Sequence, residues 1–269
     1  MTVSFDYETK LWAAHEVEAK PTYLGALRLE YALRDLASIH GKVLEIGCGG
    51  GSMTRAIKRY CPQVDVYGCD ISERAIEFGR SRSGGVEFRM GDVYDLPFAS
   101  GEMAAILMFD VLEHLDEPRL ALAEIRRTLM PGGLFHLYVP CEGELLSLPG
   151  TLMRLGWKGK ERFAGHVQRF TRSDVERLLH AQGFKVTQAL WSGHAAYQLV
   201  DTLFFLWLSL RGGNIPWSVE VFLESANDTF RTKVVRHAKN GLARLTYYES
   251  RFLARVLGAG AHFTCRKTD

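Results

Sequence analysis

Several features that mark membrane, secreted and metal-binding proteins are missing from this sequence. Its most apolar stretch, residues 197–210, is about 14 residues long and contains Asp201, whereas a membrane-spanning helix needs about 20 apolar residues. Residues 1–10 are polar and lack the apolar core of a secretory signal peptide. The five cysteines are odd in number and form no C-x-x-C pair, which argues against disulfides and zinc ligands. These absences predict a cytoplasmic protein with reduced thiols.

Overall charge is also low, but it is unevenly distributed. Residues 1–150 hold 15 Lys and Arg against 22 Asp and Glu, a balance of −7. Residues 151–269 hold 18 against 9, a balance of +9, and the two halves give the net charge of +2. The basic residues of the second half either coat solvated helix faces or attract an anionic acceptor or membrane surface. The 47% of hydrophobic residues suffices for the core of one large α/β domain.

A glycine-rich turn early in the chain is the most informative stretch. Residues 43–46 form a short apolar run typical of a buried parallel strand, and four of the five residues 47–51 are glycine. Residues 52–60 then carry apolar side chains at helical spacing. A strand, a glycine turn and a helix open a nucleotide-binding unit, because glycine lets the backbone turn sharply and lie against the ligand.

Two details of this turn argue against a dinucleotide. The G-x-G-x-x-G pattern places its third glycine at Ser52, whereas Gly51 comes one position early. A carboxylate, Glu45, precedes the turn, where it would crowd a pyrophosphate and suit a cation. The run E-I-G-C-G-G-G resembles the first motif, E/D-x-G-x-G-x-G, of the class I S-adenosylmethionine (SAM)-dependent methyltransferases. The resemblance implies that Glu45, Gly47, Gly49 and Gly51 face SAM.

Two further carboxylates follow the second and third predicted strands. Asp70 ends the strand 64–69, about twenty residues after the turn, where a carboxylate can accept the hydroxyls of an adenosine ribose. The alternative role of Asp70, capping the next helix, can be filled by Ser72. The run G-D-V-Y-D-L-P-F from Gly91 is similar to the family's second motif, in which Asp92 would bind the adenine amino group. The cofactor residues assigned after strands two to four are Asp70, Ile71, Asp92, Val93 and Phe109.

The fourth predicted strand, residues 104–109, leads into D-V-L-E-H-L-D and a helix over 117–129. The family shows an L-E-H sequence at this place, so Glu113 and His114 are expected at the mouth of the sulfonium pocket. No metal site is predicted, because adjacent Glu113 and His114 cannot easily turn to one centre from a helix. If the acceptor must lose a proton, the candidate catalytic residues are Glu113, His114 and His166. His166 lies in G-H-V-Q-R-F-T, similar to an acceptor-facing stretch of small-molecule methyltransferases, and a purely structural role for it is equally compatible with the sequence.

The alternation of strands and helices predicts a doubly wound α/β fold with a mostly parallel sheet. The resemblance implies seven strands in the order 3-2-1-4-5-7-6, the last in sequence running antiparallel. Four parts are expected: an N-terminal helical cap over 1–40, with a helix opened by Pro21, a SAM-binding core over 41–191, a helical insertion over 192–257, and the last strand within 258–269. The apolar stretch of the insertion is a core helix, a wall of the acceptor site or a membrane contact.

The expected activity is SN2 transfer of a methyl group from SAM to a small acceptor. The basic second half and the F-F-L-W run at 204–207 favour an apolar and anionic acceptor, such as a quinone, isoprenoid, lipid or natural-product intermediate. A nucleic-acid methyltransferase is disfavoured because D-V-L-E stands where base-modifying enzymes often carry N/D-P-P-Y/F. The sequence is also compatible with a protein methyltransferase or with a SAM-binding regulatory protein without catalysis. A peripheral membrane contact and a homodimer are further expected partners, and nucleic acid is not.

Overall fold

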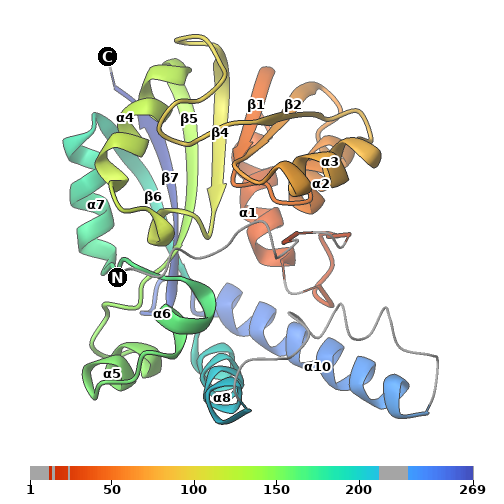
Figure 1. The fold of residues 1–269 in the computed structure, drawn as a ribbon, viewed down its shortest axis with the longest axis vertical. Coiled ribbons are helices and arrows are strands. Elements are labelled where there is room, and N and C mark those ends of the chain that lie inside the picture. Colours follow the sequence, from red (N-terminus) through yellow and green to blue (C-terminus); the bar gives the residue numbers. More distant parts are fainter. Residues whose placement is uncertain (1–11, 14–15, 24, 212–229, 269) are drawn as a thin grey trace.

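The computed structural model describes residues 12–13, 16–23, 25–211 and 230–268, and their core is one sheet covered by helices on both faces (Figure 1). The seven strands follow the order β3-β2-β1-β4-β5-β7-β6. Pairing is parallel from β3 to β5, and β7 runs antiparallel to both β5 and β6. This confirms the predicted fold class and strand order. The strands are β1 (Gly41–Ile46), β2 (Val64–Asp70), β3 (Glu87–Met90), β4 (Met103–Phe109), β5 (Leu129–Pro140), β6 (Phe184–Ser192) and β7 (Gly260–Lys267).

The two faces of the sheet carry separate hydrophobic cores. One core joins the sheet to α1, α2 and α3, and includes Leu29, Ile57 and Ile76. The other joins it to α4 and α7, and includes Ile125 and Leu179. Both faces are therefore apolar, as expected for a parallel sheet whose crossovers place helices on each side. The covering helices are α1 (Ala26–Leu36), α2 (Ser52–Tyr60), α3 (Glu73–Ser81), α4 (Pro118–Thr128) and α7 (Arg172–Ala181).

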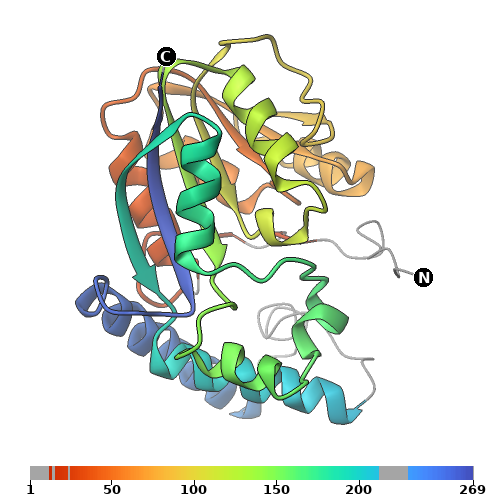
Figure 2. The ribbon, with the colours of Figure 1, turned by 90° about the vertical axis from the view of Figure 1, so that its left-hand side faces the viewer.

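A further group of helices lies beyond the carboxyl ends of the parallel strands (Figures 1 and 2). Helix α8 packs against the other three of this group, so they form one layer at that edge of the sheet. None of the described helices is long and apolar enough to cross a membrane. The members are α5 (Leu148–Arg154), α6 (Gly159–Ala164), α8 (Ala195–Arg211) and α10 (Phe230–Phe252). This confirms the helical character expected between β6 and β7, although residues 212–229 lie outside the described part.

Helix α8 buries polar side chains and exposes apolar ones, unlike an ordinary core helix. The polar Gln198 and Thr202 are buried, while Leu199, Leu203 and Trp207 expose 53%, 55% and 40% of their surface. The buried amide of Gln198 accepts from the backbone N–H of Leu148 at 2.8 Å and donates to Gly193 O at 3.1 Å. The apolar side of α8 therefore faces outward, in contrast to the core-helix interpretation of this stretch.

Two boundaries differ from the expected ones. The described residues 16–23 contain no helix, so Pro21 lies in a turn and α1 begins only at Ala26, after the cap residue Gly25. Residues 1–11 of the expected N-terminal cap lie outside the described part. The helix predicted over 117–129 ends at Thr128, and β5 starts directly at Leu129. Leu129 pairs with Met103 of β4, and the register is then interrupted until Leu134 pairs with Ala105.

Candidate functional site

The glycine turn lies at the carboxyl end of β1 and is fixed to the end of β2. The backbone N–H groups of Gly47 and Cys48 both donate to Cys69 O, at 2.8 and 3.1 Å. Gly47 has a φ of 69°, and a Cβ added there would lie 2.2 Å from Val111 Cγ2. A Cβ on Gly51, whose φ is 80°, would lie 2.4 Å from the Phe88 ring. The sequence therefore needs glycine here for both backbone conformation and space.

The N–H groups at the start of α2 are occupied by backbone carbonyls. Gly50 N donates to Trp12 O at 2.7 Å, and Ser52 N donates to Ala13 O at 3.0 Å. In dinucleotide-binding folds the N–H groups at this helix terminus bind the pyrophosphate. A pyrophosphate would have to displace residues 12–13, which supports the argument from glycine spacing against a dinucleotide.

The two carboxylates predicted to hold adenosine lie at neighbouring strand ends. Asp70 accepts from Gly49 N through Oδ2 at 2.7 Å and from Ser72 N through Oδ1 at 2.9 Å. Ser72, and not Asp70, caps α3, since its hydroxyl accepts from the N–H of Ala75 at 3.2 Å. Asp92 is exposed and accepts from Tyr94 N at 3.0 Å.

Apolar side chains stand beside these carboxylates. Ile71 and Met90, at the ends of β2 and β3, expose 55% and 57% of their surface. An adenosine has a flat apolar ring with polar edges, so exposed apolar side chains next to accepting carboxylates fit it. Val93, assigned to the cofactor from the sequence, is 9% exposed, so its side chain belongs to the core. Phe109 is also 9% exposed and packs against His136 with ring centroids 5.6 Å apart, so its side chain belongs to the core.

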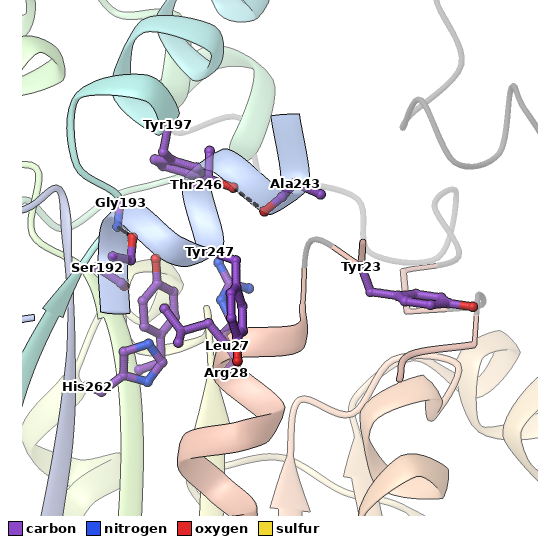
Figure 3. Close-up of a pocket in the computed structure, with 12 residues that line it drawn as sticks. Tyr23, Leu27, Arg28, Ser192, Gly193, Tyr197, Ala243, Thr246, Tyr247 and His262 are labelled. Carbon is purple, nitrogen blue, oxygen red and sulfur yellow. Dashed lines mark hydrogen bonds between the residues drawn. The ribbon is translucent and has the colours of Figure 1, made fainter. Parts of the chain in front are cut away.

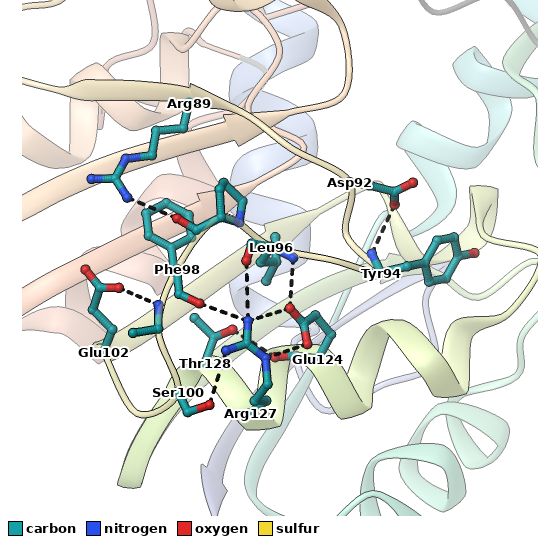
Figure 4. Close-up of polar contacts among 12 residues, drawn as sticks. Arg89, Asp92, Tyr94, Leu96, Phe98, Ser100, Glu102, Glu124, Arg127 and Thr128 are labelled. Carbon is teal, nitrogen blue, oxygen red and sulfur yellow. Dashed lines mark hydrogen bonds and ion pairs between the residues drawn. The ribbon is translucent and has the colours of Figure 1, made fainter.

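The loop that presents Asp92 is anchored to α4 (Figure 4). Arg127 donates through Nη2 to the carbonyls of Leu96 and Phe98, at 3.3 and 2.9 Å. Glu124 accepts from Leu96 N at 2.8 Å and pairs with Arg127 at 2.6 Å. Leu96 and Phe98 are themselves buried in the core. The L-P-F part of the motif thus holds the loop, which leaves Asp92 available to a ligand.

Glu45 lies behind the turn, on the side of β1 that faces α2. It is 4% exposed and accepts from Thr54 Oγ1 at 2.5 Å. Burial raises the pKa of Glu45 to about 8, Thr54 opposes this, and nearby Asp70 adds to it. Glu45 therefore keeps a proton at neutral pH in this structure, and a cationic group placed nearby would favour its ionised form.

A second polar cluster follows β4 directly. Asp110 adopts a left-handed φ of 51° and is paired with Arg28 of α1. Glu113 and His114 lie in the short 3-10 helix η1 (Leu112–His114). The backbone carbonyl of Glu113 accepts from residues 167 and 168, at 3.0 and 2.9 Å, which draws the loop containing His166 onto η1. All three predicted catalytic residues therefore meet in space, although their roles remain proposals.

The side chains of this cluster are buried and strongly influence one another. Burial raises the pKa of Glu113 to about 8 and, together with His166, lowers the pKa of His114 to about 4. His166 bonds Glu142 at 3.0 Å, and Lys160 bonds Glu142 at 2.8 Å. Burial alone would raise the pKa of Glu142, but Lys160 and His166 bring it down to about 2.

Sequence reasoning missed Glu142, Lys160 and Asp201, which complete the cluster. Lys160 is 5% exposed and also bonds Asp201 of α8 at 2.7 Å. A buried lysine between two carboxylates has no recognisable sequence spacing. The only local signal was the charged Glu142 directly after the apolar fifth strand.

A small cavity lies at the same edge of the sheet (Figure 3). Its volume is about 50 Å³, room for one or two water molecules. Arg28 lies over the Tyr138 ring, 4.0 Å from its centroid, and Arg28 also holds Asp110, which connects the cavity to the end of β4. The lining includes Arg28, Tyr138, Tyr197, Tyr247 and His262. It is smaller than a typical ligand pocket, so it forms at most part of an acceptor site.

Comparison with known proteins agrees with this geometry. Residues 44–137, from β1 to β5, match the family profile described as "Methyltransferase domain". Residues 44–137 of this chain thus match a methyltransferase domain, in agreement with the class that the sequence motifs resemble. The matched residues include the glycine turn, Asp70, Asp92 and η1, so the features built up above are those of the methyltransferase domain. The cofactor of this class is S-adenosylmethionine.

Two curated relatives align with the methyltransferase domain. An uncharacterised methyltransferase of Schizosaccharomyces pombe is 31% identical over 118 residues, which is 39% of this chain and 41% of that protein. An O-methyltransferase of Aspergillus nomiae is 28% identical over 166 residues, 57% of this chain and 68% of that protein. The chain thus spans between 41% and 68% of the length of these relatives.

The fold also matches solved structures. The 4+2 cyclase SpnF superposes with a TM-score of 0.59 at 19% identity, covering 90% of this chain and 81% of that one. At this identity the likeness concerns the fold only. Because that structure is titled a cyclase, it also illustrates that the fold does not by itself determine the reaction.

Proposed function

We propose that this protein transfers the methyl group of SAM to a small acceptor molecule. The observation that carries the proposal is the arrangement at the carboxyl edge of the sheet. There the glycine turn and the two adenosine carboxylates, Asp70 and Asp92, lie beside a buried cluster of histidines and carboxylates after β4. Val111 packs against Gly47, so the two groups are neighbours.

The chain's own residues would hold SAM at three points. Asp92, with Ile71 and Met90 beside it, would bind the adenine ring, and Asp70 would accept the ribose hydroxyls. The backbone of residues 47–49 would lie along the methionine part of SAM, and Glu45 would supply a carboxyl group behind this backbone. Bound SAM supplies a methyl group activated by the positive sulfonium. The protein therefore has mainly to align the acceptor and to exclude water.

The chemistry needs a nucleophilic atom on the acceptor. Its lone pair attacks the methyl carbon while the carbon–sulfur bond breaks, and the electron pair stays on sulfur to give S-adenosylhomocysteine. A hydroxyl acceptor must also lose its proton. Glu113, His114 and His166 are the proposed residues for handling that proton, because they lie together at the end of β4.

The proposed acceptor is apolar with a hydroxyl or acidic group, in the class of quinone, isoprenoid, lipid or natural-product intermediates. Arg28 and the tyrosines of the small cavity offer polar contacts at the edge of the sheet. The outward apolar face of α8 offers an apolar contact nearby. The O-methyltransferase title of the Aspergillus nomiae relative supports an oxygen acceptor.

Calorimetric titration with SAM and S-adenosylhomocysteine tests the cofactor assignment. We expect micromolar binding that Asp92→Asn and Asp70→Asn each weaken about 10- to 100-fold, because each loses a charge-assisted hydrogen bond. Asp65→Asn is the matched control, since Asp65 is exposed on the same strand as Asp70. Absence of binding to either ligand would contradict the proposal. Binding without transfer of labelled methyl to any hydroxylated aromatic or prenylated acceptor would favour a regulatory SAM-binding protein instead.

A further inference from the structure

The carboxyl group of Glu113 is buried without a hydrogen-bond partner. Its side chain is 1% exposed, and neither oxygen accepts a hydrogen bond from the described residues. Leaving a buried polar group unpaired costs free energy, and natural structures satisfy most such groups. A buried carboxyl group that points to no donor therefore indicates that the site binds something else.

Two histidines turn their Nε2 atoms toward this carboxyl group. His114 Nδ1 lies 3.0 Å from Gly165 O, so that nitrogen carries the proton and Nε2 presents a lone pair. His166 Nδ1 lies 3.0 Å from a Glu142 oxygen, which gives His166 the same orientation. The two Nε2 atoms lie 3.9 and 4.0 Å from Glu113 Oε1. The rings are nearly perpendicular, at 83°, so they approach one point from different directions.

We propose that Glu113, His114 and His166 bind a divalent transition-metal ion. One potential ligand atom from each lies within 4.8 Å of the others. Metal–ligand bonds of about 2.1 Å would place these atoms about 3.0 to 3.4 Å apart, so binding must draw them together by about 1 Å. Two imidazoles and one carboxylate suit zinc, iron, manganese or cobalt better than magnesium or calcium, and they leave coordination positions open.

This inference replaces the expectation that no metal binds. That expectation rested on Glu113 and His114 occupying a regular helix. They occupy a 3-10 turn of three residues instead, and the third ligand comes from the loop at His166. The positions of the three ligand side chains are therefore not restricted by the spacing of a regular helix.

The surroundings resemble the outer shell of a metal site. Glu142 bonds the far nitrogen of His166, the arrangement by which carboxylates orient metal-binding histidines. Lys160 bonds both Glu142 and Asp201.

The role of the ion rests on the proposed function. With the ion bound, Glu113, His114 and His166 would act on the acceptor's proton through the metal and not as bases themselves. An acceptor hydroxyl bound at an open position would have a lower pKa and would lose its proton to water. Its oxygen would then attack the methyl carbon as the carbon–sulfur bond breaks, and the electron pair of that bond stays on sulfur. The cluster lies at the end of β4, next to the glycine turn through the contact of Val111 with Gly47.

Metal binding can be tested without any acceptor. Protein treated with chelator and dialysed is titrated with Co²⁺, followed by visible absorption, and with Zn²⁺, followed by calorimetry. We expect one ion per chain, with binding weakened more than 100-fold by Glu113→Gln or His166→Asn. Glu142→Gln, which keeps all three ligands, should weaken it about 10- to 100-fold. The exposed Glu117→Gln and His180→Asn are matched controls and should bind like wild type.

Circular dichroism melts in chelator show whether each variant folds, and Glu142→Gln keeps the test available if a ligand variant does not. The proposal is overturned if wild type binds no ion at one per chain, or if folded His166→Asn binds as tightly as wild type. With the catechol probe 4-nitrocatechol, we expect a spectral shift on cobalt-loaded wild type that is absent from His166→Asn. An unchanged spectrum would contradict open coordination positions. If the ion binds but labelled methyl reaches no hydroxyl acceptor, the proposed function fails while the metal site stands.

Discussion

Substituting Gly47 by alanine gives the most direct test of how the glycine turn is built. Gly47 has a left-handed φ of 69°, and its absent Cβ would lie 2.2 Å from Val111 Cγ2. The conformation costs an alanine about 1–2 kcal/mol. The overlap with Val111 adds about 1–3 kcal/mol, typical of overpacking. Gly47→Ala should therefore destabilise the protein by about 2–5 kcal/mol.

Val111→Ala removes the clash and separates the two costs. The atoms next nearest to the added Cβ are Val111 Cβ and Cγ1, at 3.5 and 3.6 Å, so only the γ carbons of Val111 need to go. Combining Gly47→Ala with Val111→Ala should leave the conformational cost and remove the overlap. The double variant should thus be about 1–3 kcal/mol more stable than the sum of the single effects predicts.

Urea unfolding of the four proteins of this cycle measures that coupling, and calorimetry with SAM measures the effect on the site. We expect Gly47→Ala to bind SAM at least 10-fold more weakly, and Val111→Ala to restore part of the loss. Additive free energies of unfolding would refute the reasoning, because the contact between Gly47 and Val111 would then carry no cost. Unchanged SAM binding in Gly47→Ala would refute the placement of the cofactor at this turn.

Three other predictions concern buried charge and loop anchoring. The folded state keeps the Glu45 proton that the unfolded chain loses near its ordinary pKa. Glu45 should therefore lower the stability as pH rises toward about 8, by at most about 1.4 kcal/mol per pH unit. Urea unfolding at pH 5.5 and 7.5 should show a smaller slope in Glu45→Gln than in wild type, because Glu113, whose pKa is also raised, keeps its own contribution. Lys160→Met removes the ammonium group shared by Glu142 and Asp201 and leaves Glu142 with His166 as its remaining partner. It should cost about 3–5 kcal/mol in thermal or urea unfolding, whereas a cost below 1 kcal/mol would show that the lysine is not needed. Arg127→Gln should weaken SAM binding several-fold by releasing the loop of Asp92, and calorimetry equal to wild type would show that the buried Leu96 and Phe98 hold the loop alone.

The fold, and the placement of the proposed cofactor residues at one edge of the sheet, could be predicted because their signals are local. The groups that would bind SAM stand at the ends of three strands: the glycines directly after β1, Asp70 as the last residue of β2, and Asp92 two residues after β3. A parallel sheet brings such strand ends to one edge, so the site follows from the strand order. The signal for the end of α7 is equally local, since Gly183, with a φ of 73°, follows the cap residue Gln182.

The second cluster could not be predicted because it depends on contacts between distant segments. His166 reaches Glu113 only because residues 167 and 168 donate to the Glu113 carbonyl. Lys160 meets Asp201 only because α6 packs on α8. The direction of the apolar face of α8 could not be decided either, since an apolar run of this kind fits a core helix, an acceptor wall or a membrane contact until its neighbours are known. In these cases tertiary contacts, and not local pattern, determine the environment of the side chain.

The position of β7 has a consequence for how the chain folds during synthesis. β7 lies between β5 and β6 in the sheet, yet it follows α8 and α10 in the chain. Until residue 267 has left the ribosome, β5 presents an unpaired edge and β6 pairs with no other strand. Such edges are prone to pair with other chains. We therefore expect ribosome-bound chains that stop before β7 to need chaperone protection, and late release of β7 to be the step that completes the sheet.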